Sequence, residues 1–225
     1  MRLLFAAGAL ALLGSERIAE NQRAARSTLR SIAAAQAEFQ AAVEIDTNCD
    51  GVGEYGYFGE LAGADPMRVS HFCEPGAGVA PADILSPPLL RSPFGRVAGS
   101  LVSHRGYLFQ MWLPYQTVTG TVPAVEEDPS GGKGAAPFPG SVNGARMWCC
   151  YAWPIDYGRT GDRVYFLNQR GLLLECKNWG LWPYDGTTNM PAYDEAYSVA
   201  GDMSSPLRVG AAGGNHQTIW TPFQL

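Results

Sequence analysis

The pattern of hydrophobic and polar residues divides the chain after its first 44 residues. An apolar run from Leu3 to Leu13 continues, without a proline, into a charged amphipathic stretch from Ser15 to about Val43. Beyond this point the helical periodicity disappears, and glycine, proline and aromatic residues become frequent. The pattern predicts a long N-terminal helix followed by a compact head.

The amphipathic stretch has the spacing of an α-helix. Residues on its apolar side recur every seven positions, and the polar Gln22 and Gln36 interrupt the neighbouring row, so the apolar seam is narrow. Alanine is abundant, which favours a helix at little entropic cost. A helix from Leu3 to Val43 would be about 60 Å long. The seam and the row beside it consist of Ile18, Ala25, Leu29, Ile32, Phe39 and Val43.

Two interpretations of the apolar run remain open. Its eleven or so residues are fewer than the roughly 20 that a helix needs to span a bilayer. The positive start at Met1-Arg2 suits a secretory signal peptide, although no A-x-A pattern immediately precedes Ser15 or Glu16. A retained apolar tip would instead be buried in lipid or against other subunits.

The start of the amphipathic stretch carries a family resemblance. Residues 21–36 read NQRAARSTLRSIAAAQ and follow an N-E-x-x-A-x-x-S-L-R-x-I-x-x-A-Q pattern, with Gln22 in place of the glutamate and Thr28 in place of the serine. This segment resembles the region just after the membrane-embedded part of bacterial type IV pilins and pseudopilins. The chain departs from the family at its start. The aromatic residue followed soon by a glutamate is absent, no acidic residue precedes Glu16, and the apolar run is about half the length that spans a membrane.

Three downstream motifs follow one another in the order found in the head of a pilin-like group. They are GYLF at 106–109, AWP at 152–154 with Tyr157-Gly158, and FLNQRG at 166–171. The resemblance implies an extracellular or cell-surface structural subunit of a filament or pseudopilus in a bacterial envelope. It would form a homopolymer through its helices, with transient inner-membrane contact before assembly. The residues expected to make the assembly contacts are Leu3, Leu4, Phe5, Leu10, Leu12, Leu13, Ile18, Leu29 and Ile32.

The remainder of the chain predicts a small antiparallel sheet. Four short aromatic or apolar runs are bounded by turn residues, and the last three form a candidate meander. We therefore expect an α+β fold in which the long helix packs on the sheet, with residues 1–44 as the helix and residues 45–225 as the head. The expected strands are Tyr107–Leu113, Met147–Trp153, Arg163–Asn168 and Leu172–Cys176.

Charge and motif content disfavour two classes of function. The net charge of −5 lacks the basic footprint of a nucleic-acid-binding protein. No catalytic triad, metal set or pair of acids has a recognisable spacing. We therefore expect a non-enzymatic protein, with a secreted or periplasmic binding module as the alternative to a filament subunit.

One segment has the opening of a calcium loop. Residues 46–51 read DTNCDG, and alternating oxygen ligands before a glycine turn allow a short backbone to surround a hard cation. The ligands would be Asp46, Asn48, Asp50 and Glu54, but Tyr57 replaces the final glutamate of an EF-hand. An Asx-rich turn that ends the helix is the alternative. No other cofactor is expected.

Five cysteines occur at no zinc-like spacing. In an exported protein some of them would be oxidised. The candidate pairs are Cys49 with Cys73, and Cys176 with Cys150 or its neighbour Cys149.

The aromatic residues form the last notable group. Six tryptophans and ten tyrosines are present, and such residues usually fill a core or mediate contacts between subunits. A sugar-binding face is the alternative interpretation of this group.

Overall fold

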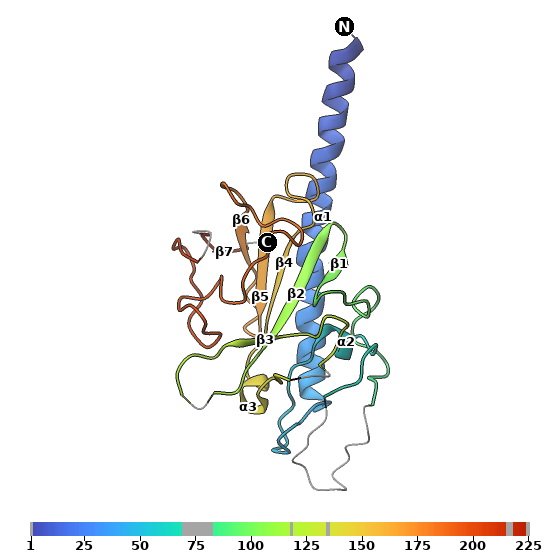
Figure 1. Ribbon diagram of the computed structural model, residues 1–225. Helices are drawn as coiled ribbons and strands as arrows, with labels where there is room; N and C mark the ends of the chain where they lie inside the picture. The colour runs from blue at the N-terminus through green and yellow to red at the C-terminus, as the bar shows by residue number, and fades with distance from the viewer. Residues whose placement is uncertain (1, 69–82, 118, 134–135, 215–217, 224–225) are drawn as a thin grey trace.

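The computed structural model describes residues 2–68, 83–117, 119–133, 136–214 and 218–223, with side chains described from Gly14 onward. It is an α+β structure in which one long helix lies against an antiparallel sheet (Figure 1). Helix α1 runs from Arg2 to Ala41, and two one-turn helices follow, α2 (Phe58–Leu61) and α3 (Ser141–Gly144). The predicted long helix and the predicted fold class are confirmed at this level.

The sheet has seven strands in the order β1-β2-β4-β5-β6-β7, with β3 paired to β2 outside this path. Strands β4, β5 and β6 form the predicted meander, and Arg163–Asn168 was predicted with its observed bounds. The strands are β1 (Val102–His104), β2 (Tyr107–Pro114), β3 (Ala124–Glu126), β4 (Cys149–Pro154), β5 (Arg163–Asn168), β6 (Leu174–Lys177) and β7 (Thr221–Pro222).

Helix α1 covers one face of the sheet with the seam that its sequence pattern predicts. Ala25, Leu29, Ile32 and Phe39 are all buried in one core cluster, together with alternate residues of β2, β4 and β5. Alternation arises because successive side chains of a strand point to opposite faces. The buried Gln36 is also accommodated, since its amide group donates to and accepts from the backbone of Gly56.

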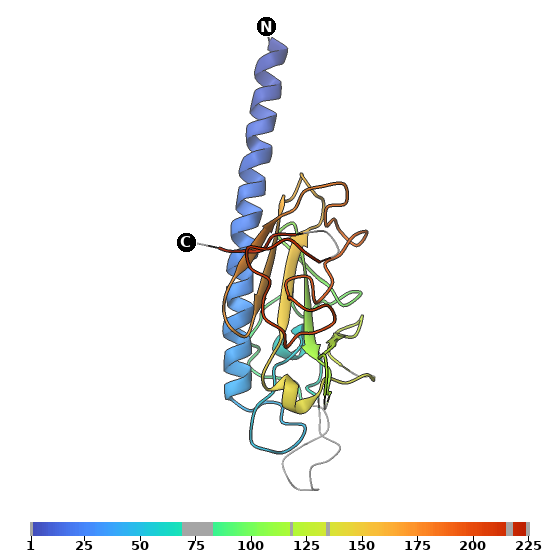
Figure 2. The same ribbon diagram turned by 90° about the vertical axis from the view of Figure 1, so that its left-hand side faces the viewer.

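The opposite face of the sheet is covered by the C-terminal part of the chain (Figure 2). A second cluster contains the strand residues whose side chains point to this opposite face. Among them, Tyr151 and Phe166 pack against Tyr197 and Trp220. Coverage of both faces explains why β2 and β4 are buried along their whole length. The aromatic residues of the sheet therefore belong to two cores and not to an exposed sugar-binding face.

Candidate functional site

Helix α1 extends well beyond the head at its N-terminal end (Figures 1 and 2). Near the point where it leaves the head, Asn21 donates to the carbonyl of Thr160 at 2.9 Å and Gln22 donates to Asp162. Residues 14–17 are exposed. The part of α1 before Asn21, residues 2–20, measures about 28 Å at the helical rise of about 1.5 Å per residue. We call it the projecting half.

The predicted assembly residues divide between the two halves of α1. Ile18 lies on the projecting half and is partly covered. Leu29 and Ile32 are fully buried against the sheet, so their assignment as assembly contacts is corrected: they form the core of the head. The helix also contains Leu3, Leu4, Phe5, Leu10, Leu12 and Leu13, whose side chains lie outside the described part.

Two arginines of α1 contact the C-terminal segment of the head. The Nη1 of Arg26 donates to the Tyr165 hydroxyl at 3.0 Å, and its guanidinium lies 4.3 Å from the ring centre of Phe223. The guanidinium of Arg30 lies 5.9 Å from the same ring. The C-terminal segment therefore helps to hold α1 on the sheet.

The residues proposed as calcium ligands do not form one set. Both carboxylate oxygens of Asp46 accept backbone N–H bonds, from Asp50 and Gly51. The carboxylate of Glu54 is buried, accepts from the backbone N–H of Thr47 at 2.8 Å and lies 3.6 Å from Arg68 Nη1. Asn48 donates its amide to Asp50 at 2.8 Å. This segment has the hydrogen bonds of an Asx-rich turn, and the calcium site stays a prediction.

A buried ionic network next to this turn was not identified from the sequence. The Nε of Arg68 lies 2.9 Å from Glu60 Oε1, and its Nη1 faces Glu54. The other oxygen of Glu60 accepts the backbone N–H of Tyr57 at 2.7 Å, which closes the capping box of α2. One arginine thus connects the segment after α1 with α2. A buried charge requires such partners, because desolvation would otherwise be costly.

A second buried carboxylate anchors the glycine-rich loop to α2. Glu127 Oε1 accepts backbone N–H bonds from Gly59 at 2.8 Å and Gly132 at 2.9 Å, while Oε2 accepts from Phe58 at 3.3 Å. Burial raises the pKa of Glu127 to about 8, although these N–H donors act in the opposite direction. The Gly131-Gly132 segment therefore forms a defined turn around this carboxylate.

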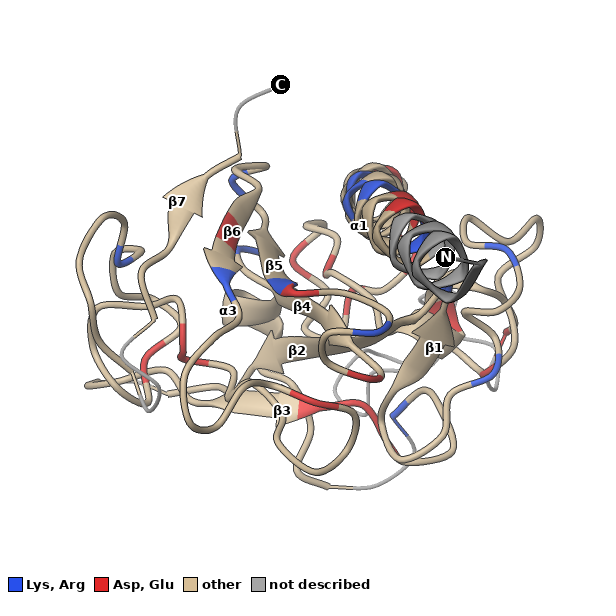
Figure 3. Cartoon of the chain, turned by 90° about the horizontal axis from the view of Figure 1, so that it is seen from above, with Lys and Arg blue, Asp and Glu red and all other residues tan. Residues whose placement is uncertain are grey.

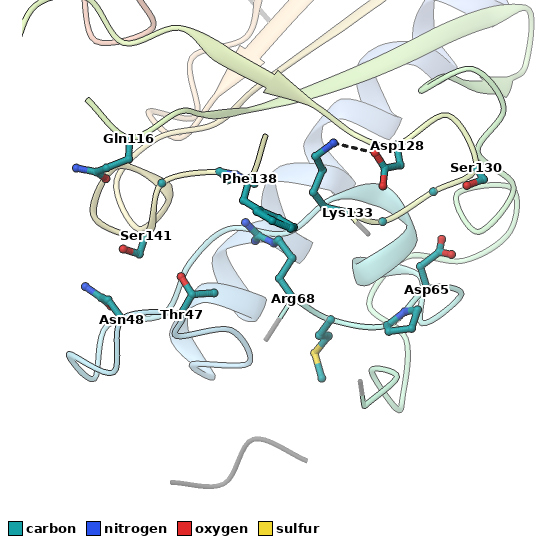
Figure 4. Close-up of a pocket in the computed structure, with 16 residues that line it drawn as sticks. Thr47, Asn48, Asp65, Arg68, Gln116, Asp128, Ser130, Lys133, Phe138 and Ser141 are labelled. Atoms are coloured by element: carbon teal, nitrogen blue, oxygen red, sulfur yellow. Dashed lines mark hydrogen bonds and ion pairs between the residues drawn. The ribbon is translucent and has the colours of Figure 1, made fainter. Parts of the chain in front are cut away.

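A cavity of about 730 Å³ lies beside these networks (Figure 4). Ser141 of α3 lines it, and α3 lies at the end of the head opposite to the projecting half (Figure 1). Arg68 and Phe138 face the cavity, and Lys133 is 2.8 Å from Asp128 in an ion pair. Its cations are therefore already paired with carboxylates. The lining of the cavity offers a ligand apolar contact with Phe138 and the polar side chains of Thr47, Gln116 and Ser141.

The cysteines of the sheet are free thiols. Cys150 and Cys176 were predicted to pair, but β5 lies between their strands and the two residues belong to cores on opposite faces. Cys149 is also free. This prediction is therefore wrong, because Cys150 and Cys176 lie on strands that are not adjacent and their side chains lie on opposite faces of the sheet. Cys73 lies outside the described residues, so the pairing of Cys49 with Cys73 stays a prediction.

Neither a metal-binding cluster nor a membrane-spanning helix occurs among the described residues. No group of three or more histidine, cysteine or acidic side chains there has a metal-binding arrangement. In the same part of the chain, no helix combines the length and apolar character required to cross a membrane.

Comparison with known proteins adds no relative. No protein-family model, curated protein or solved structure matches the chain significantly. The functional conclusions therefore depend on the geometry described above.

Proposed function

We propose that this chain is a structural subunit of a pilin-like filament or pseudopilus at the bacterial cell surface. The observation that carries the proposal is the division of α1 into a half packed on the head and a half that projects from it (Figure 1). Subunits would bundle their projecting halves, with the apolar run Leu3 to Leu13 at the centre of the bundle. The heads would then lie around this bundle.

Energetics support an intermolecular role for the projecting half. Most helical stability in proteins comes from packing of an apolar face. The fully buried seam of α1 begins at Ala25, and Asn21 and Gln22 are hydrogen-bonded to the head, whereas residues 14–17 are exposed. We infer that the apolar run of the projecting half gains its partners from other copies of the chain or from lipid.

Assembly can be tested with a matched pair of variants of the full chain. Leu13→Asp places a charge in the apolar run, and Val142→Asp places the same charge at an exposed position in α3, at the other end of the molecule. We expect wild type and Val142→Asp to form detergent-dispersible polymers by sedimentation and electron microscopy. Leu13→Asp should remain a folded monomer.

A monodisperse wild-type monomer that keeps residues 2–13 and needs no detergent would contradict the proposal. Equal assembly of Leu13→Asp and wild type would also contradict it. Circular dichroism of each variant confirms that the head remains folded in these comparisons.

A soluble secreted or periplasmic binding module is the second candidate, and the cavity beside Arg68 and Phe138 favours it. In that case α1 would serve only as the helical layer of the head. Mass spectrometry of the natural protein separates the two candidates. A mature N-terminus near Ser15 or Glu16 would favour the binding module, whereas retention of the apolar run would favour the filament.

A further inference from the structure

The most exposed large apolar side chains of the described head occur together in one short loop. Trp179 is 72% exposed, Leu181 is 92% exposed and Trp182 is 76% exposed. The other four tryptophans, at 112, 148, 153 and 220, are buried in the two cores. We call residues 179–182 the apical loop. Its composition differs sharply from that of an ordinary polar surface turn.

The apical loop is held at its base by specific hydrogen bonds. The buried Asn178 clamps Tyr184, because its amide donates to the Tyr184 carbonyl and its oxygen accepts the Tyr184 N–H, both at 2.8 Å. Asn189 donates to the carbonyls of Trp182 at 3.0 Å and Pro183 at 2.8 Å. Gly180 has a φ of +114°, a conformation that side-chain-bearing residues rarely adopt. The fold thus fixes the loop while leaving its apolar side chains in solvent.

The apical loop lies at the end of the head from which α1 projects. Strand β6 ends at Lys177, opposite Arg163 at the start of β5. The next residue, Asn178, donates its N–H to the carbonyl of Asp162 at 3.0 Å. Asp162 also accepts from Gln22 of α1. Loop and projecting half therefore leave the head at the same level.

Charges around this end do not offer a strong electrostatic site. Viewed along α1, basic and acidic residues are interspersed (Figure 3). Arg159 is 3.2 Å from Asp156 and Arg163 is 3.3 Å from Glu175, so these cations have local partners. An occupant of the loop would be recognised mainly through apolar and aromatic contact.

We propose that the apical loop contacts the interfacial region of a lipid bilayer while the apolar run of the same chain is inserted in it. Tryptophan favours the boundary between headgroups and acyl chains, because its ring has a large apolar surface and one polar N–H group. The run Leu3 to Leu13 is about 16 Å long as a helix, close to one leaflet of a hydrocarbon core of about 30 Å. The unassembled subunit would make this membrane contact, so the contact does not depend on the formation of filaments.

Intrinsic fluorescence tests this contact directly, because Trp179 and Trp182 are the accessible tryptophans of the head. Full-length protein is mixed with phosphatidylcholine vesicles whose acyl chains are brominated either near the headgroup or near the methyl end. We expect the protein to float with the vesicles in a density gradient at low and high salt, whereas polymer without lipid would sediment. Quenching should be stronger with the bromine near the headgroup.

Two variants and one control assign the signal. Trp179→Phe/Trp182→Phe keeps the loop apolar, so vesicle binding should persist while quenching is lost. Trp179→Ser/Leu181→Ser/Trp182→Ser should reduce vesicle partitioning by roughly tenfold or more, the effect of exposing one or more large apolar side chains. Phe138→Ser, at an exposed site beside the cavity at the opposite end, should bind vesicles like wild type.

Several results would overturn the proposal. These are failure of the wild type to bind vesicles, binding without quenching, and stronger quenching from bromine near the methyl end. Protection of the two tryptophans from acrylamide only in polymers would identify a neighbouring subunit as the occupant instead. Filaments without lipid quenching would contradict the membrane contact but not the filament function. Quenching without filaments would contradict the filament function but not the membrane contact.

Discussion

The division of α1 into a packed and a projecting half can be measured with one pair of isoleucines. Ile32 is fully buried against the sheet, whereas Ile18 lies on the projecting half, four helical turns away on the same seam. Replacing each with alanine removes the same three carbon atoms from the same helix. The difference between the two effects therefore reports packing on the head and not helix propensity.

The expected magnitude for Ile32→Ala follows from its complete burial. Three methylene equivalents at about 0.8 kcal/mol each give about 2.4 kcal/mol, and the cavity left behind raises the cost to about 3–4 kcal/mol. Ile18→Ala should cost less than about 1 kcal/mol, because the head offers this side chain little to pack against. With a urea slope of about 2 kcal/mol/M, Ile32→Ala should shift the unfolding midpoint by about 1.5–2 M.

The assay is urea unfolding of the full chain in one mild detergent, followed by tryptophan fluorescence and far-ultraviolet circular dichroism. Detergent keeps the polymer dispersed, so the free energy of unfolding refers to the subunit. Equal losses of stability in the two variants would refute the division of α1. A loss below about 1 kcal/mol for Ile32→Ala would refute the packing of the seam on the sheet.

Three further predictions concern the head. Arg68→Met should lower the free energy of unfolding by about 3–5 kcal/mol, because Glu54 and Glu60 lose their buried cation. Arg91→Met, at an exposed position, should change the free energy of unfolding by less than about 0.5 kcal/mol. Similar urea unfolding curves for the two variants would contradict the network. Glu127 binds a proton in the folded state up to about pH 8, whereas the unfolded carboxyl has a pKa of about 4.5, so stability should fall as the pH rises from about 4.5 to 8. Glu127→Gln should flatten this dependence in urea unfolding measured across that range, and an unchanged slope would contradict the assignment. The free thiols of the sheet should react with iodoacetamide only after unfolding, because burial raises their pKa values; rapid labelling of native protein, followed by mass spectrometry, would contradict their burial.

The sequence pattern was sufficient for the longest helix and for the central strands. Helix α1 was predicted because a long stretch repeats one hydrophobic spacing, and the β4–β6 meander was predicted because short aromatic or apolar runs are bounded by turn residues. Strands β1, β3 and β7 were missed because each has only two or three residues, too few to establish alternation. Their existence depends on pairing with longer strands elsewhere in the chain.

Site features were harder to predict because they join distant segments. Glu127 meets Gly59 across 68 positions, and Arg68 meets Glu60 only because α2 and the chain after it fold back. The sequence signal for these buried networks was a single charged residue within an apolar or glycine-rich segment. The apical loop was visible as a Trp-Gly-Leu-Trp run at 179–182, but a core position was the natural expectation for such residues.

The central claim is that copies of this chain assemble into a filament through the projecting half of α1. The most direct measurement is electron microscopy of material sheared from the native cell surface, labelled with an antibody against the head. Labelled filaments of uniform width would agree with the claim. A label confined to soluble protein, with no labelled filaments, would contradict it.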